Sequence, residues 1–287
     1  MANDVELVSE RRHIEKAWDG DVTLKQQNSL LLTATSSIDQ ARLLAAVSAH
    51  AGDWLHAAPI SSIGLRLSNE AIRVAVGHRL GTNTCQPHEC LSGKKVDARG
   101  LHGLACRKAT ARQQRNSHLN EILWRSIKRA QVPATREPVG LFRSDGKCPD
   151  GSTQISWARG KPLAWDVTVH DTYADSHINS TSITAGAAAN HAATAKSAKY
   201  ANLTSSHIFV PFVIETYGAW NAQSLRPLSW PKKLADAQQL SRLTGDPLET
   251  VHLFQRLSIA IQQANAVCFT STFKSEWEPY PTVGLIV

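Results

Sequence analysis

Hydrophobic residues recur along this chain with two periods, and each period predicts a different kind of element. Apolar positions three and four residues apart favour helices, and alanine-rich stretches favour them through high intrinsic propensity. Asn69 fits the N-cap of one such helix, and Gly81 fits the residue just past its end. The predicted helices are 38–51, 69–81, 118–131, 182–203 and a last helix that begins at Asp246.

The middle of the chain carries the signals of strands. Residues 163–171 are rich in β-branched and aromatic residues, and 207–218 form a near-continuous apolar run that is typical of a buried central strand. Two shorter strands are expected before them, in 134–142 and 151–158. Together with the flanking helices, the order is helix, strand, strand, strand, helix, strand. This order predicts an α/β core with a small mixed sheet.

Four regions follow from this pattern. Residues 1–81 are expected to form a helical N-terminal extension, and 82–117 a loop region that contains a cluster of cysteine and histidine. Residues 118–217 would form the α/β core, and 218–287 a C-terminal helical region that ends in an unstructured tail.

The composition narrows the class of protein. Hydrophobic residues make up 42% of the 287 residues and charged residues 19%, which is the balance of a globular protein rather than a disordered one. No apolar run is long enough for a membrane helix, and the N-terminus lacks the apolar segment of a secretory signal. Five irregularly spaced cysteines argue against a disulfide scaffold and favour a reducing, intracellular setting.

Positive charge is concentrated in one segment. Residues 91–150 contain 13 basic and 5 acidic side chains, so their formal charge of +8 exceeds the +7 of the whole chain. Such a segment is expected to face phosphates, although a solvated basic surface without a partner is the alternative. The candidate nucleic-acid-binding residues are Arg112, Arg115, His118, Arg125, Lys128, Arg129 and Lys147.

Two carboxylates on neighbouring predicted strands form a candidate metal site. Asp150 lies in a turn that enters one strand, and Asp166 lies in the middle of the next. Two carboxylates and several waters suit Mg²⁺ or Mn²⁺, which can polarise a phosphodiester. The alternatives are a structural salt bridge for Asp166 and an ordinary Pro-Asp-Gly turn for Asp150.

Further side chains are candidates for the same site. Glu121 on the preceding helix could reach the metal through a water. Lys196 and Lys199 lie on the alanine-rich helix, with Tyr200 beside them, and an ammonium group there could position a nucleophile or neutralise transition-state charge. Taken alone, these lysines would be read as a solvated helix face.

The ordered set of these residues resembles the restriction-like endonuclease domain of certain non-long-terminal-repeat retrotransposons. That domain belongs to the PD-(D/E)XK nuclease superfamily. The resemblance covers roughly residues 40–267, and its core matches lie in 85–215. The residues that carry it are the Pro149-Asp150 pair, the strand acid Asp166, and the displaced Lys/Tyr motif at Lys196, Lys199 and Tyr200.

The resemblance implies a fold and an activity. The fold would be a PD-(D/E)XK restriction-endonuclease-like core with αβββαβ order, a helical N-terminal extension and C-terminal helices. The activity would be Mg²⁺-dependent nicking of chromosomal DNA, which places the protein in the nucleus. In this family the lysine often moves to the following helix, and Thr168 here occupies the usual lysine position.

The cysteine and histidine cluster resembles the zinc knuckle that precedes the nuclease core in this family. Zn²⁺ needs four nitrogen or sulfur ligands, and the candidates are Cys85, Cys90, His102 and Cys106. The family pattern places a second cysteine where this chain has Ser92. A site here must therefore pair Cys85 or His88 with Cys90, or it has been lost and leaves free cysteines and surface histidines.

We therefore expect a metal-dependent DNA endonuclease derived from a retroelement. The competing hypothesis is a catalytically inactive or domesticated fragment that binds DNA or RNA without cleaving it. The missing cysteine at position 92 favours some decay of this kind. A soluble interaction protein without a nucleic-acid role is a third possibility.

Overall fold

The computed structural model describes residues 19–106, 108–109, 111–141, 148–228 and 249–274. Lys147 and the predicted helix start at Asp246 lie outside these residues, as does most of the predicted tail. Among the described residues, none of the helices combines the length and the apolar character that a membrane crossing requires. The chain forms a mixed α/β structure with one four-stranded sheet and one small two-stranded sheet.

The N-terminal region is helical, as its pattern predicts. A helical segment at 19–33 precedes α2, whose N-cap Ser36 accepts a hydrogen bond from the backbone of Asp39. The N-cap of α3 is Ser68 and not Asn69, because the Ser68 hydroxyl accepts from the Ala71 N–H. Gly81 ends α3 in the left-handed conformation that glycine tolerates best. These elements are α2 (Ser37–Val47), η1 (Asp53–His56), η2 (Ser61–Ile63) and α3 (Asn69–Leu80).

The region 82–117 contains more regular structure than predicted. A short antiparallel hairpin joins β1 (His88–Glu89) to β2 (Lys95–Val96), and the short helix α4 (His102–Ala105) follows. The amphipathic helix predicted at 118–131 is α5 (Ala111–Arg129), which begins seven residues earlier than the apolar pattern suggested. The first two turns of α5 carry mainly polar side chains, so they lack the apolar stripe on which the prediction relied.

The central sheet has the strand order β3-β4-β5-β6. The first three strands are antiparallel neighbours, and β6 pairs with β5 in parallel over eight residues. The parallel pair needs a crossover, which α7 supplies. The strands are β3 (Ala134–Arg136), β4 (Gly151–Thr153), β5 (Leu163–His170) and β6 (Ile208–Glu215).

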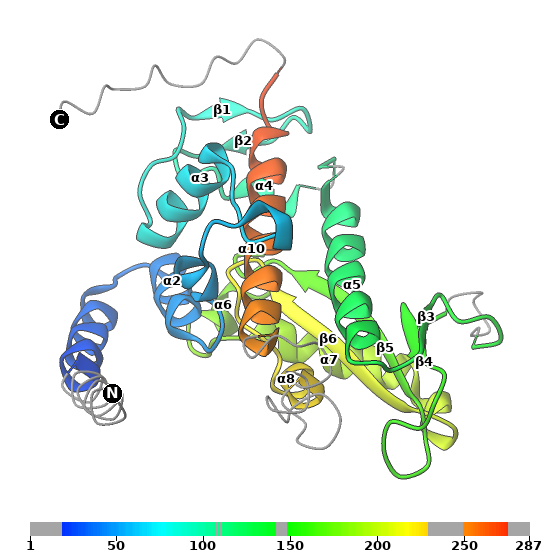
Figure 1. Ribbon diagram of the computed structural model, residues 1–287. Coiled ribbons are helices and arrows are strands. Elements are labelled where there is room, and N and C mark those ends of the chain that lie inside the picture. Colours follow the sequence, from blue (N-terminus) through cyan, green and yellow to red (C-terminus); the bar gives the residue numbers. More distant parts are fainter. Residues whose placement is uncertain (1–18, 107, 110, 142–147, 229–248, 275–287) are drawn as a thin grey trace.

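Helices cover both faces of this sheet (Figure 1). On one face, α5 and α10 (Glu249–Thr270) pack against apolar side chains of β5 and β6. On the other face, small side chains of α7 (Ala187–Lys199) let the helix approach Val213 of β6 closely. The remaining elements are α6 (Ile178–Thr181), η3 (Ala201–Ser205) and α8 (Ala222–Leu228).

The helix α10 joins the two largest apolar cores. Leu253, Phe254 and Leu257 belong to the core against the sheet, whereas Cys268 and Phe269 pack with α3 and the cysteine-containing loops. Figure 1 shows this helix running beside α5 and reaching the N-terminal helices. The predicted regions therefore share buried surface rather than forming separate cores.

Candidate active site and metal centre

The open edge of β5 lines a large polar cavity. Beyond Trp165, β5 has no neighbouring strand on the β4 side within the described sheet, because β4 pairs only with Ala164 and Trp165. Two edge N–H groups instead meet side chains: Val167 donates to Asp150 Oδ2 at 2.6 Å, and Val169 donates to Asn116 Oδ1 at 3.2 Å. The cavity beside this edge has a volume of about 1390 Å³ and is lined by residues of α5, β5 and α7.

Asp150 and Asp166, predicted as metal ligands, both line this cavity. Asp166 is buried in the middle of β5, with 8% of its surface exposed. Burial raises the pKa of Asp150 to about 6, and repulsion by the Asp166 carboxylate adds to this shift. The hydrogen bond from Val167 and the charge of Lys196 act in the opposite direction. The two carboxylates therefore concentrate negative charge at a half-buried position. A divalent cation bound there would reduce the repulsion between them.

Hydrogen bonds from α5 and from the residue that ends α7 hold the segment that carries Asp150. Asn120 of α5 donates from Nδ2 to the Asp150 carbonyl at 3.2 Å and accepts from Trp165 Nε1 at 2.8 Å. Tyr200, at the end of α7, donates its hydroxyl to the Cys148 carbonyl at 3.0 Å. Tyr200 is buried, so the structure gives it a positioning role rather than a place in the cavity.

Gly151 fixes how closely this segment approaches β5. An added Cβ at this position would lie 2.1 Å from Cζ2 of Trp165, which is far inside van der Waals contact. The absence of a side chain lets the indole of Trp165 pass beneath β4, where its Nε1 reaches Asn120. The glycine therefore sets the register that brings Asp150 to the Val167 N–H.

Only one of the two predicted lysines reaches the carboxylates. Lys196 forms an ion pair through Nζ with Oδ1 of Asp166 and lines the cavity. Lys199 lies three residues later, is exposed, and does not line the cavity. Lys199 is the last residue of α7, rotated by about 60° from Lys196 and about 4.5 Å further along the helix axis, and it does not reach the carboxylates.

Glu121 does not face the carboxylate pair. Its Oε1 pairs with Arg125 at 2.6 Å, and its Oε2 pairs with Arg136 of β3. It is also absent from the residues that line the cavity. The expectation that Glu121 reaches the metal through water is therefore corrected, because both of its oxygens are engaged by arginines.

The predicted nucleic-acid-binding residues divide between two faces of α5. Arg112 and Arg115 both line the main cavity, but Arg115 is buried and donates to Asn265 of α10 at 3.2 Å. Lys128 lies over the ring of Trp124, with Nζ 4.6 Å from the ring centroid. A separate groove of about 450 Å³ between α5 and α10 is lined by His118, Arg125, Arg129 and Arg256. The basic segment therefore does not form one continuous surface on the cavity side.

Sequence reasoning missed the two asparagines that support the site. Asn116 and Asn120 lie one helical turn apart on α5, together with Arg112 one turn earlier. Polar residues at this spacing indicate a helix face that meets polar groups, and this signal was available in the sequence. Their partners, the edge N–H groups of β5 and the carbonyl of Asp150, become visible only in the folded chain.

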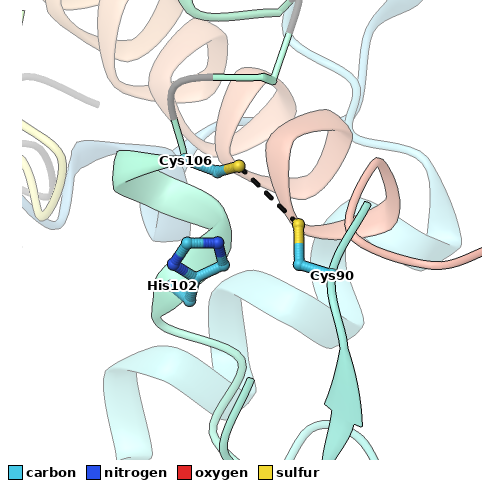
Figure 2. Close-up of side chains that lie close together, drawn as sticks. All are labelled: Cys90, His102 and Cys106. Carbon is cyan, nitrogen blue, oxygen red and sulfur yellow. Dashed lines mark hydrogen bonds between the residues drawn. The ribbon is translucent and has the colours of Figure 1, made fainter. Parts of the chain in front are cut away.

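Cys90, His102 and Cys106 form a compact cluster in the region 82–117 (Figure 2). One possible ligand atom from each lies within 4.8 Å of the other two, and the two sulfur atoms are 3.7 Å apart. Two thiolates on tetrahedral Zn²⁺, with bonds of about 2.3 Å, lie about 3.8 Å apart by simple geometry. The separation of the two sulfur atoms therefore fits Zn²⁺.

The protonation of the cluster also suits a metal. Burial tends to raise the pKa of Cys106, but hydrogen bonds from the Lys108 backbone, Ser92 and Cys90 lower it below its ordinary value. Burial lowers the pKa of His102, which keeps its imidazole neutral. A thiolate and a neutral imidazole are the forms that bind Zn²⁺.

Ser92 occupies the remaining side of the cluster. Its Oγ lies 3.2 Å from Nε2 of His102, and its N–H donates to Sγ of Cys90 at 3.5 Å. The Ser92 hydroxyl therefore lies next to the cluster and in contact with one of its three members.

The structure places the predicted ligand Cys85 outside the cluster, and this expectation is corrected. Its thiol donates to the carbonyl oxygens of Asp97 and Ala98, at 3.4 and 3.6 Å. Burial raises the pKa of Cys85, which favours the thiol over the thiolate. His88, the other alternative, lies 2.9 Å from the Thr272 hydroxyl and stacks on Phe273.

Comparison with known proteins adds no family assignment. No protein-family model matches the chain, and no curated protein is similar to it in sequence.

Proposed function

We propose that the chain is a metal-dependent DNA endonuclease with a PD-(D/E)XK-type core. The observation that carries this proposal is the pair of Asp150 and Asp166 at the open edge of β5, with Lys196 beside them. The element order α5-β3-β4-β5-α7-β6 supports it, because it matches the αβββαβ order that the sequence resemblance implies.

The residues present fit a hard divalent cation. Asp150 and Asp166 would hold Mg²⁺ or Mn²⁺ through carboxylate oxygens, and the raised pKa of Asp150 marks negative charge that lacks a full counterion. When bound, such an ion polarises the phosphodiester and helps to generate the attacking hydroxide.

Other side chains would orient the reactants. The Lys196 ammonium can hold the attacking water or neutralise charge on the phosphate, because it already lies against Asp166. Asn120 and Tyr200 keep the Asp150 segment in place through hydrogen bonds to backbone carbonyls. Arg112 would contact the DNA backbone from α5, which implies salt-sensitive and weakly sequence-specific binding.

The cluster of Cys90, His102 and Cys106 would hold Zn²⁺ in a structural role. Cys90 and Cys106 belong to the apolar core that also contains residues of α3 and α10. A bound ion would tie β1, α4 and the start of α5 together.

Nicking of supercoiled plasmid tests the catalytic proposal. The wild-type chain is expected to nick in the presence of Mg²⁺ or Mn²⁺ and not in the presence of a chelator. Asp166→Asn keeps the shape of the side chain but removes a metal ligand, so nicking should fall more than about 100-fold. Asp175→Asn is the matched control, because Asp175 is exposed and does not line the cavity.

The outcomes separate the two hypotheses. Equal nicking by Asp166→Asn and wild type would remove the catalytic assignment. DNA binding by the wild-type chain without any cleavage would favour the inactive nucleic-acid-binding protein instead.

A further inference from the structure

Three histidines from separate parts of the chain lie near one another at the end of β5. His170 ends β5, His177 immediately precedes α6, and His191 lies on α7. The ring centroids of His170 and His177 are 6.0 Å apart, and those of His177 and His191 are 5.7 Å apart. The fold therefore gathers three imidazoles that are up to 21 residues apart in the sequence.

Two of these histidines face the same cavity as the candidate metal site. His170 and His177 line it together with Asp166, Lys196 and Arg112. Alternate residues of a strand share a face, so His170 projects on the same side of β5 as Asp166. Four residues of strand separate them, which corresponds to about 13 Å. The two histidines therefore line a part of the same cavity that lies further along β5 than the carboxylates.

The imidazoles retain free hydrogen-bonding capacity. Within the described part of the chain, the ring nitrogens of His170, His177 and His191 make no hydrogen bond to protein atoms. Burial lowers the pKa of His170 to about 4, and repulsion by His177, Lys196, His191 and Arg112 contributes to this. His170 is therefore neutral at pH 7 and offers one N–H donor to the cavity.

We propose that His170 and His177 form a subsite for a second backbone phosphate of the bound nucleic acid. N–H donors beside an arginine, in a cavity with few apolar walls, suit phosphate oxygens. Successive phosphates of one strand rise by about 3.4 Å along the helix axis and also rotate around it, so a straight distance of about 13 Å spans about two nucleotides. The inference rests on the proposed function in one respect: the scissile phosphate is taken to lie at Asp150 and Asp166.

Binding without cleavage tests this subsite. The affinity of the full chain for an end-labelled DNA duplex is measured by fluorescence anisotropy without divalent cations, so that nicking cannot interfere. Replacing both histidines by Phe keeps the rings but removes the donors, and we expect affinity to fall about tenfold. Replacing both by Gln keeps an N–H donor and should recover most of that loss. His56→Ala is the control, because His56 is exposed in η1, outside the cavity.

The dependence on salt distinguishes the histidine contact from a charge contact. His170→Phe should weaken binding without changing the slope of log affinity against log salt, because a neutral imidazole displaces no counterion. Arg112→Ala should lower that slope by about one.

Two results would overturn the subsite. One is equal affinity of wild type and the double Phe variant when circular dichroism shows both to be folded. The other is a loss in the Gln variant as large as in the Phe variant, because packing alone would then explain the effect. If the wild-type chain binds DNA through these histidines but does not nick it, the phosphate subsite is supported and the proposed catalysis is contradicted.

Discussion

At both candidate sites, the identity or position of a single side chain determines which chemical groups are available. Lys196 faces Asp166, whereas Lys199 on the same helix does not, so one helical turn separates a site residue from a surface residue. At the cysteine and histidine cluster, the Ser92 hydroxyl lies 3.2 Å from Nε2 of His102, at the position where the sequence resemblance implies a cysteine. If the cluster holds zinc as we propose, the residue at position 92 should affect how tightly the ion binds.

Ser92→Cys should strengthen zinc binding by about 100-fold, because a third thiolate replaces a weak oxygen ligand. Competition with a chromophoric chelator measures the affinity. Ser62→Cys, which adds an exposed thiol elsewhere, is the control and should bind as the wild type does. If the two variants bind zinc equally, the side chain at position 92 is not a fourth zinc ligand.

Glu215 gives the fold a pH dependence of its own. It is fully buried at the end of β6 and accepts hydrogen bonds from the Ala188 and Ala189 N–H groups at the start of α7. Burial raises its pKa to about 7 from an ordinary 4.5. The folded state therefore binds a proton more tightly than the unfolded state, so stability from this group is complete below pH 4.5 and declines as pH rises through 7.

Glu215→Gln should remove this decline, because glutamine keeps the acceptor oxygen and never ionises. At pH 8 the variant should be more stable than wild type by about 3 kcal/mol, and at pH 4.5 the two should be nearly equal. Urea unfolding at both pH values measures the difference. A variant that is less stable than wild type at pH 8 would contradict the raised pKa.

At the scale of elements, the register between β4 and β5 places Asp150 beside Val167. Gly151 makes this register possible, because any side chain there would collide with Trp165. Gly151→Ala should destabilise the fold by about 3 kcal/mol through overpacking. Gly20→Ala is the control, because nothing lies near that position in its helix and alanine favours helix there. Thermal unfolding of the two variants measures the contrast, and equal stability would contradict the close approach.

The elements that the sequence predicts best are those with a strong apolar pattern. The strands in 163–171 and 207–218 and the alanine-rich helix are confirmed, because burial on both faces leaves a long apolar signature. The short strands β3 and β4 cover only part of their predicted ranges, and α5 starts earlier than its apolar stripe. In these places hydrogen bonds to distant residues, rather than local patterning, determine the structure.

The candidate sites, too, could be predicted only in part from the sequence. Asp150, Asp166 and Lys196 were predicted from type and order, and the structure brings them to one cavity. The sequence paired Cys90 with either Cys85 or His88, and the exclusion of Cys85 could not be made from spacing. It depends on the fold around the hairpin of β1 and β2, where the Cys85 thiol donates to the carbonyls of Asp97 and Ala98.

At the scale of the whole molecule, α10 makes the two main cores interdependent. Its apolar residues enter the sheet core through Leu257 and the N-terminal core through Phe269. The chain should therefore unfold in one cooperative transition, with coincident changes in tryptophan fluorescence and far-UV circular dichroism. Two separated transitions would show that the predicted regions are stable on their own.

The proposed nuclease activity requires that Asp150 and Asp166 together bind a divalent cation. Electron paramagnetic resonance of free Mn²⁺ counts the ions that the protein removes from solution, independently of any cleavage. Wild type and Asp175→Asn are expected to bind one Mn²⁺ at the pair, and Asp166→Asn should lose that ion, because one carboxylate cannot replace two. Equal binding of Mn²⁺ by Asp166→Asn and wild type would contradict the account.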